Sequence, residues 1–190
     1  SISLIDYNRI ALNSDEQSVF LKDKGMKIGF GAIGKGYAAN KAKIIIEEMG
    51  IKNGLVNAGG DLIAWGMDEN EKEWRIAIAD PTKNNIVAAW LSIHNTAIVT
   101  SGDYERFAMI NDVRYSHIID PRTGYPTKGI KSVTVVCPDA ELADALATSV
   151  FVLGEKDGLS LINQIHGVEC LIINDDNQFK SSTNLELQYN

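Results

Sequence analysis

Two oxygen-bearing side chains are spaced to act together. Asp144 and Thr148 lie four residues apart in a segment expected to be helical, so they share one helix face. The rest of that face is small or apolar (Ala140, Ala147 and Phe151), so we expect it to pack against the protein. A carboxylate buried without a partner is costly, and Mg²⁺ or Ca²⁺ is a natural partner because hard cations prefer oxygen ligands. The alternative is a carboxylate bonded to nearby backbone, with the threonine bonding back along its own helix.

A second candidate is a histidine in a loop-rich stretch, residues 100–127, which combines hydroxyls, charges and residues of fixed backbone geometry. His117 is the only one of the three histidines in such surroundings. Imidazole titrates nearest neutrality, so His117 is a candidate general acid or base, or a donor to phosphate. The alternative is a structural role. We expect His94 and His166 to be structural or surface residues.

A glycine-dense turn over residues 28–36 is expected to lead from a strand into a helix. Glycines let backbone N–H groups approach an anion, and a helix N-terminus adds a favourable dipole. Gly29, Gly31 and Gly34 spell GxGxxG, the pattern of dinucleotide-binding loops. That interpretation also requires an acidic residue at the end of the next strand, where this sequence has Asn57.

The same turn also matches part of the P-loop motif. Gly29, Gly34 and Lys35 fit GxxxxGK, but a P-loop continues with Ser or Thr to hold magnesium, and here the next residue is Gly36. Both nucleotide motifs are therefore incomplete. A third interpretation is a tight strand-to-helix turn that binds no ligand.

Two long helices must position these groups. The first is expected over residues 34–49, and the second opens at Pro138 and Asp139 and ends at Gly154. Apolar residues at helical spacing predict their core-facing stripes. The stripes are Ala38, Ala42, Ile45, Ile46 and Met49 in the first helix, and Leu142, Leu146, Val150 and Leu153 in the second.

Shorter apolar runs predict strands, and a third helix is expected over residues 156–165. The expected strands cover residues 9–12, 19–21, 26–28, 55–57, 61–65, 74–79, 86–93, 133–137 and a closing set within 168–187. Strands and helices interleave with hairpins between them, which favours an α+β fold over a doubly wound sheet.

Composition narrows the function classes. The chain has 190 residues, 45% apolar and 23% charged, which suits one sizeable core and argues against two large domains. A net charge of −7 argues against a general nucleic-acid binder, because affinity for a duplex comes largely from Lys and Arg on phosphates. An anionic small molecule remains compatible with this charge. Cys137 and Cys170 lie in apolar runs without a CxxC motif, so we expect small buried hydrophobic residues.

Together these segments resemble the ApbE-type FAD:protein FMN transferases. The resemblance rests on five ordered motifs between Met26 and Gly154. They are FGAIGKGYAA (30–39), LVNAGGD (55–61), TSGDYERF (100–107), YSHIIDPRTGYP (115–126), and SVTV (132–135) followed by ADALAT (143–148). The resemblance implies an ApbE-like, T-fold-related α+β architecture with mixed or antiparallel sheets and packed helices.

The resemblance also implies a reaction and its site. The family binds FAD, uses Mg²⁺ at its pyrophosphate, and transfers FMN to a Ser or Thr hydroxyl of a target protein with release of AMP. By this resemblance the metal ligands are Asp144, Thr148 and the backbone carbonyl near Ala32. Lys35 matches a position near the flavin nucleotide, Gly29 and Ala32 belong to the flavin-binding turn, and His117 matches a histidine close to the reacting phosphates.

Two positions depart from the family pattern. Many relatives begin the glycine turn with an Asp that helps to hold FAD, where this chain has Gly29, and Asn40 replaces an acidic residue common after the same turn. Family members also carry well over a hundred residues ahead of the turn. We therefore expect residues 1–190 to be a single domain, the C-terminal part of a flavin transferase, without its upstream region.

The expected partners are FAD and an acceptor protein with a flavinylated Ser or Thr, such as an electron-transport subunit. The family implies an extracytoplasmic, lipid-anchored location. The alternative function is a non-catalytic FAD-binding or FAD-hydrolysing protein on the same scaffold.

Overall fold

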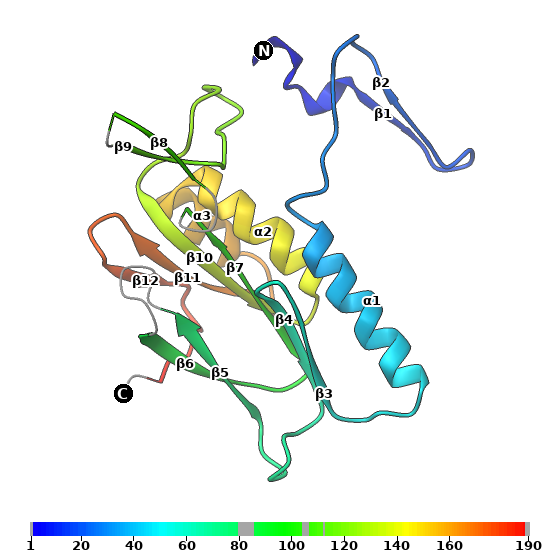
Figure 1. Ribbon diagram of the computed structural model, residues 1–190, viewed down its shortest axis with the longest axis vertical. Helices are drawn as coiled ribbons and strands as arrows, with labels where there is room; N and C mark the ends of the chain where they lie inside the picture. The colour runs from blue at the N-terminus through cyan, green and yellow to red at the C-terminus, as the bar shows by residue number, and fades with distance from the viewer. Residues whose placement is uncertain (1, 80–85, 104–106, 112, 189–190) are drawn as a thin grey trace.

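The computed structural model of the chain describes residues 2–79, 86–103, 107–111 and 113–188. Its centre is a six-stranded sheet in which neighbouring strands are antiparallel (Figure 1). In spatial order the strands are β12 (Phe179–Ser181), β11 (Glu169–Asn174), β10 (Ile130–Cys137), β7 (Thr96–Gly102), β4 (Asp61–Trp65) and β3 (Gly54–Ala58).

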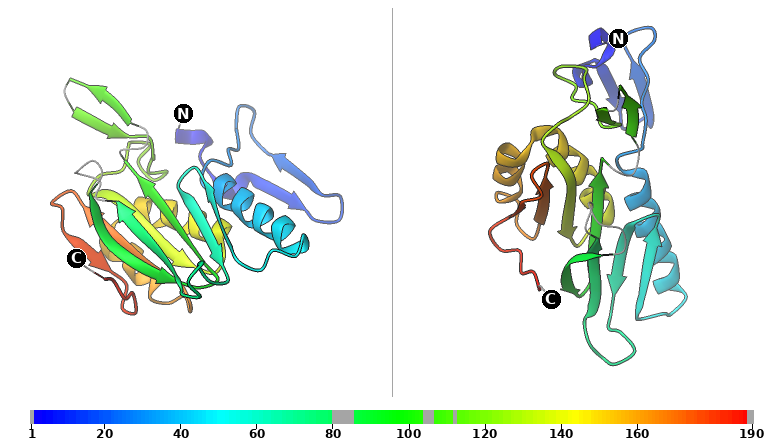
Figure 2. Two further views of the ribbon diagram at one scale, coloured as in Figure 1. Left: turned by 60° about the horizontal axis from the view of Figure 1, so that its bottom comes forward. Right: turned by 60° about the vertical axis from the view of Figure 1, so that its left-hand side comes forward.

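Three helices cover one face of this sheet (Figures 1 and 2). They are α1 (Gly34–Glu48), α2 (Ala140–Leu153) and α3 (Glu155–Ile162). Side chains alternate between the two faces along a strand, so Val99 of β7 packs beneath α2 while the adjacent Ile98 points to the opposite face. There it meets residues of the β5 (Trp74–Ala79) and β6 (Val87–Ile93) hairpin. The expected α+β fold is confirmed.

Smaller elements extend from this body. Two short 3₁₀ helices, η1 (Ile2–Leu4) and η2 (Tyr7–Arg9), precede the β1 (Ile10–Asn13) and β2 (Ser18–Leu21) hairpin, which projects away from the central sheet (Figure 1). Within the stretch expected to be loop-rich, β8 (Phe107–Ile110) and β9 (Val113–Ser116) form a further hairpin. Among the described residues, no helix is both long and apolar enough to cross a membrane.

The expected core stripe of α2 is confirmed only in part: Val150 is fully buried and Leu146 packs against the core. Leu142 is 44% exposed, whereas the helix buries its small residues, Phe151, Val150 and also Asp144. Alanines at the inner positions let the helix lie close to its neighbours, so the small-residue face packs and Leu142 turns outward. The packing expected for the face of Asp144 is therefore confirmed. Cys137 and Cys170 are buried free thiols, as expected.

The expected stripe of α1 is wrong for a similar reason. Met49 is 74% exposed and Ile45 58% exposed, while Gly36 and Ala39 are the buried positions. Gly36 lies directly against Ala140 of α2, where a side chain on the glycine would clash with the alanine carbonyl oxygen. The two helices thus cross at backbone contact, and the larger apolar residues of α1 face away from this crossing.

One expected strand is also wrong. Residues 26–30 form no strand, so the glycine turn is entered from an extended segment, and residues 31–33 form a turn directly ahead of α1. The carbonyl oxygen of Phe30 accepts hydrogen bonds from the backbone N–H groups of Ile33 (3.2 Å) and Gly34 (2.8 Å). These bonds close the turn and direct the chain into the helix.

The crossing yields a stability prediction. Gly36→Ala should lower the free energy of unfolding by about 1–3 kcal/mol, because the added methyl group forces α1 and α2 apart. Urea denaturation followed by circular dichroism measures the change. Gly34→Ala is the matched control, since a methyl group there meets nothing within 4 Å. It should leave stability unchanged or raise it by up to about 1 kcal/mol. Equal effects at both positions would contradict the crossing argument.

Candidate functional site

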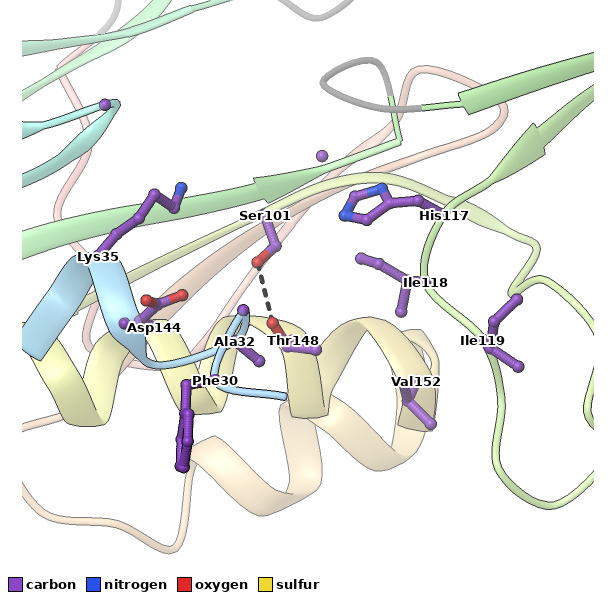
Figure 3. A pocket seen from close by; sticks show the side chains of 14 residues that line it. Phe30, Ala32, Lys35, Ser101, His117, Ile118, Ile119, Asp144, Thr148 and Val152 are labelled. Atoms are coloured by element: carbon purple, nitrogen blue, oxygen red, sulfur yellow. Dashed lines mark hydrogen bonds between the residues drawn. The ribbon is translucent and has the colours of Figure 1, made fainter. Parts of the chain in front are cut away.

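A cavity of about 710 Å³ opens where the glycine turn, α2 and the loop after β9 meet. Its walls combine backbone from the glycine turn with polar side chains from the start of α1, from β7, from the loop after β9 and from α2 (Figure 3). The lining includes Ala32, Lys35, Ser101, His117, Asp144 and Thr148. In Figure 3, Lys35 and Asp144 lie at one end of the cavity and His117 at the other, with Thr148 between them.

Asp144 is the buried acid of this cavity. Its side chain is 3% exposed, and its Oδ2 accepts a hydrogen bond from the backbone N–H of Gly36 at 3.1 Å. That N–H belongs to the first turn of α1, whose leading N–H groups have no partner inside the helix. The carboxylate of α2 therefore supplies a partner to α1, which is the backbone-bonding alternative considered above. A carboxylate has two oxygens and several lone pairs, so this bond is compatible with a cation ligand.

Thr148 lies one helical turn after Asp144, on the same face of α2. Its hydroxyl is 3.3 Å from the Ser101 hydroxyl at the end of β7, and either group can donate (Figure 3). The pair joins the helix to the sheet at the floor of the cavity. A hydroxyl in this position offers its remaining lone pair to a hard cation beside the carboxylate.

The loop that carries His117 is held at both ends. Before it, the buried Ser116 hydroxyl accepts the backbone N–H of Ile118 at 3.1 Å, which sets the turn around the exposed histidine. After it, Arg122 bonds the Asp120 carboxylate through Nε (2.9 Å) and the carbonyl oxygen of Val152 in α2 through a second nitrogen (2.9 Å). This guanidinium holds the pKa of Asp120 below its usual value. The bonds anchor the loop to the helix that carries Thr148.

Sequence reasoning did not select Asp61, which the structure places beside the cavity residues. The side chain is fully buried at the first position of β4, and its Oδ1 accepts a hydrogen bond from Lys35 Nζ at 2.9 Å. Burial raises the pKa of this carboxyl to about 7; the Lys35 hydrogen bond lowers it and the Asp144 charge raises it. The signal in the sequence was a carboxylate opening an apolar strand directly after two glycines.

The structure brings together five of the six residues expected in the site: Ala32, Lys35, His117, Asp144 and Thr148 all line the cavity. Gly29, the sixth, is exposed and does not belong to the lining.

Asn40, the other departure from the family pattern, has a packing role. Its side-chain oxygen accepts the backbone N–H of Ala140 at 3.0 Å, so it satisfies an N–H at the start of α2.

Comparison with known proteins shows which family the chain belongs to. A model of the ApbE family matches residues 1–172. The chain belongs to the ApbE family. It is 35% identical over 178 residues to the FAD:protein FMN transferase of Treponema pallidum, covering 88% of this chain and 49% of that protein. It is 35% identical over 173 residues to the Escherichia coli K12 protein of the same name, covering 90% of this chain and 49% of that one.

Solved structures agree with the fold. The Thermotoga maritima ApbE protein superposes with a TM-score of 0.86 at 34% identity, covering 96% of this chain and 62% of that one. The apo flavinyl transferase ApbE of Pseudomonas stutzeri gives a TM-score of 0.78 at 26% identity, covering 95% of this chain and 56% of that one. The chain thus spans about half the length of the Treponema and Escherichia relatives.

Proposed function

We propose that this chain is the part of a flavin transferase that binds a divalent cation and the FAD pyrophosphate, and that the whole protein transfers FMN from FAD to a Ser or Thr hydroxyl of an acceptor protein. One observation carries the proposal. The buried Asp144 carboxylate, the Thr148 hydroxyl and His117 of the loop converge on one cavity at the N-terminus of α1, in a member of the ApbE family.

The donor set fits a hard cation such as Mg²⁺. Asp144 and Asp61 are both buried and close enough for their charges to interact, yet the side chain paired with Asp61 is the single ammonium of Lys35. Asp61 Oδ2 is buried, and among the described residues it has no hydrogen-bond partner. Among the described residues, two buried carboxyl groups lie beside one ammonium, so above the pKa of Asp61 they carry an excess of negative charge. Asp144, Thr148 and the Ala32 carbonyl would hold the cation, which would neutralise pyrophosphate charge when bound.

In the proposed reaction the acceptor hydroxyl oxygen attacks the phosphorus on the FMN side of FAD. A phosphoester bond to the acceptor forms, the bond between that phosphorus and the bridging oxygen breaks, and AMP leaves with the bridging oxygen. The hydroxyl proton must be removed, and His117 is the side chain of the cavity suited to take it. Apart from this proton transfer, the protein has mainly to position the reactants and to stabilise the charge that develops, as is usual in phosphoryl transfer.

We propose that further FAD contacts come from chain outside these 190 residues, as the greater length of the relatives supports. The outer side of α1 and the short segment that follows it also support this, because five large side chains there stand at least 46% exposed. These residues are Tyr37, Ile44, Ile45, Met49 and Ile51. An apolar face of this kind is typical of a surface that packs against further protein.

The decisive experiment incubates the full-length protein with FAD, Mg²⁺ and candidate acceptor proteins from electron-transport complexes. A mass gain of one FMN minus water on an acceptor, with release of AMP, supports the transferase. Release of AMP and free FMN without acceptor labelling would favour the FAD-hydrolysing alternative. Binding without cleavage would favour a flavin-binding protein.

Removal of the proposed ligands should give a graded loss. Asp144→Ala should abolish Mg²⁺-dependent FAD cleavage by the full-length protein, because it removes the charged ligand. Thr148→Val keeps the shape and removes one neutral oxygen, so it should raise the Mg²⁺ concentration required and reduce the rate less. Cleavage rates across a Mg²⁺ titration measure both. Wild-type rates for Asp144→Ala at saturating Mg²⁺ would exclude Asp144 as a ligand.

Replacement of the histidine separates chemistry from binding. His117→Asn should slow FMN transfer by about 10²–10⁴-fold, the usual contribution of a general acid or base, with a much smaller effect on FAD affinity. Single-turnover rates and calorimetric titration measure the two quantities. A parallel fall in rate and affinity would make His117 a positioning residue.

The isolated 190-residue chain should bind FAD at least about 100-fold more weakly than the full-length protein, since a loss of roughly 3 kcal/mol of contacts corresponds to that factor. Calorimetry of both proteins with FAD and Mg²⁺ makes the comparison. Equal affinities would place the whole flavin site within residues 1–190.

A further inference from the structure

Asp61 occupies an unusual position for a carboxylate. It follows two glycines with positive φ, Gly59 (64°) and Gly60 (103°), and begins the apolar strand β4 with none of its side chain exposed. A fully buried carboxylate is costly unless its oxygens are paired. One oxygen accepts from Lys35, and the other is the buried Oδ2 that has no hydrogen-bond partner within the described part of the chain.

The ion pair ties the cavity to the sheet. Lys35 belongs to the first turn of α1, is 36% exposed and lines the cavity, whereas Asp61 lies behind it in β4. The lysine side chain is long and has several rotatable bonds, so its position depends on where its ammonium finds a carboxylate. Among the described residues, Asp61 provides such a carboxylate at 2.9 Å.

Asp144 is the second carboxylate near this ammonium, because its charge acts on Asp61 and its side chain lines the same cavity as Lys35. An ammonium and a divalent cation compete for the same carboxylate oxygens, since both need negative charge at close range. If Asp61 carried no charge, the Lys35 ammonium would pair with Asp144 and oppose the entry of a cation.

We propose that Asp61 is a positioning residue that holds the Lys35 ammonium away from Asp144 and so keeps Asp144 available to a divalent cation. The inference rests on the proposed function, because it assigns a partner to the cation site described there. It extends that function by giving a role to a buried carboxylate outside the cavity lining. Asp61 acts through Lys35 and needs no contact with the cation.

The net charge of the three side chains sets the expected order of cation affinity among the variants. At pH 8, above the Asp61 pKa of about 7, Lys35, Asp61 and Asp144 together carry −1 in the wild type, 0 in Asp61→Asn, −2 in Lys35→Met and −1 in the double variant. Cation affinity should follow this order. If Asp61 had only a structural role, Asp61→Asn would lower Mg²⁺ affinity by distorting the site. Removal of the lysine in the double variant would then not restore that affinity.

The test is calorimetric titration of the four full-length proteins with MgCl₂ alone at pH 8, without FAD. Asp61→Asn should lower Mg²⁺ affinity about tenfold, within the range of coupling energies between neighbouring charged groups. Lys35→Met should raise the affinity above that of the wild type, and the double variant should return it to near the wild-type value. Circular dichroism and melting temperature confirm that each variant is folded.

Lys43→Met is the matched control, because it makes the same substitution on α1 at a lysine paired with Glu47 and outside the cavity lining. It should leave Mg²⁺ affinity unchanged. Wild-type affinity in Asp61→Asn, or a double variant no better than Asp61→Asn, would overturn the proposal. If Asp61→Asn does not fold, Lys35→Met decides: higher affinity supports the proposal and equal or lower affinity overturns it.

Asp144→Ala in the same titration separates this inference from the proposed function. Loss of Mg²⁺ binding in Asp144→Ala, together with wild-type affinity in Asp61→Asn, overturns only the role of Asp61. Absence of Mg²⁺ binding in the wild type, or full binding in Asp144→Ala, overturns the cation site and this inference with it.

Discussion

The backbone contact between α1 and α2 is the constraint on which the rest of the site depends. Gly36 has no side chain, so the first turn of α1 lies against Ala140, and its N–H reaches the Asp144 carboxylate across 108 residues of sequence. At the same crossing, Asn40 of α1 satisfies an N–H at the start of α2. Each helix therefore supplies a side-chain acceptor for a backbone N–H in the first turn of the other helix. The glycine turn is fixed over Asp144 as a direct result.

Charge balance is the second organising feature. The protein buries two acidic side chains next to one another, a costly arrangement in the absence of positive charge. The Lys35 ammonium offsets part of that cost and links α1 to β4. Folding and the proposed cation binding thus use the same carboxylates.

Much of the fold was predictable from local pattern. β4 and β5 lie where alternating or apolar runs indicated them, and α2 ends at the expected glycine. The core-facing stripe was predicted wrongly in α1 and correctly only in part in α2, where Val150 and Leu146 pack as expected. Periodicity identifies which residues are apolar, but it does not tell which side of a helix meets its neighbour. In both helices, close approach to the neighbouring helix favours small residues on the buried side, and Met49 and Leu142 are exposed.

The sequence by itself determined the chemical inventory: an acid and a hydroxyl on one helix face, a histidine in a rigid loop, a glycine turn before a helix, and the motifs of the ApbE family. Only the tertiary structure decided which of these groups meet. It joined Lys35 to Asp61 and excluded Gly29 from the cavity lining. The physical reason is that such contacts depend on the distance between neighbouring helices and strands. That distance is set by the volumes of the side chains on both elements together.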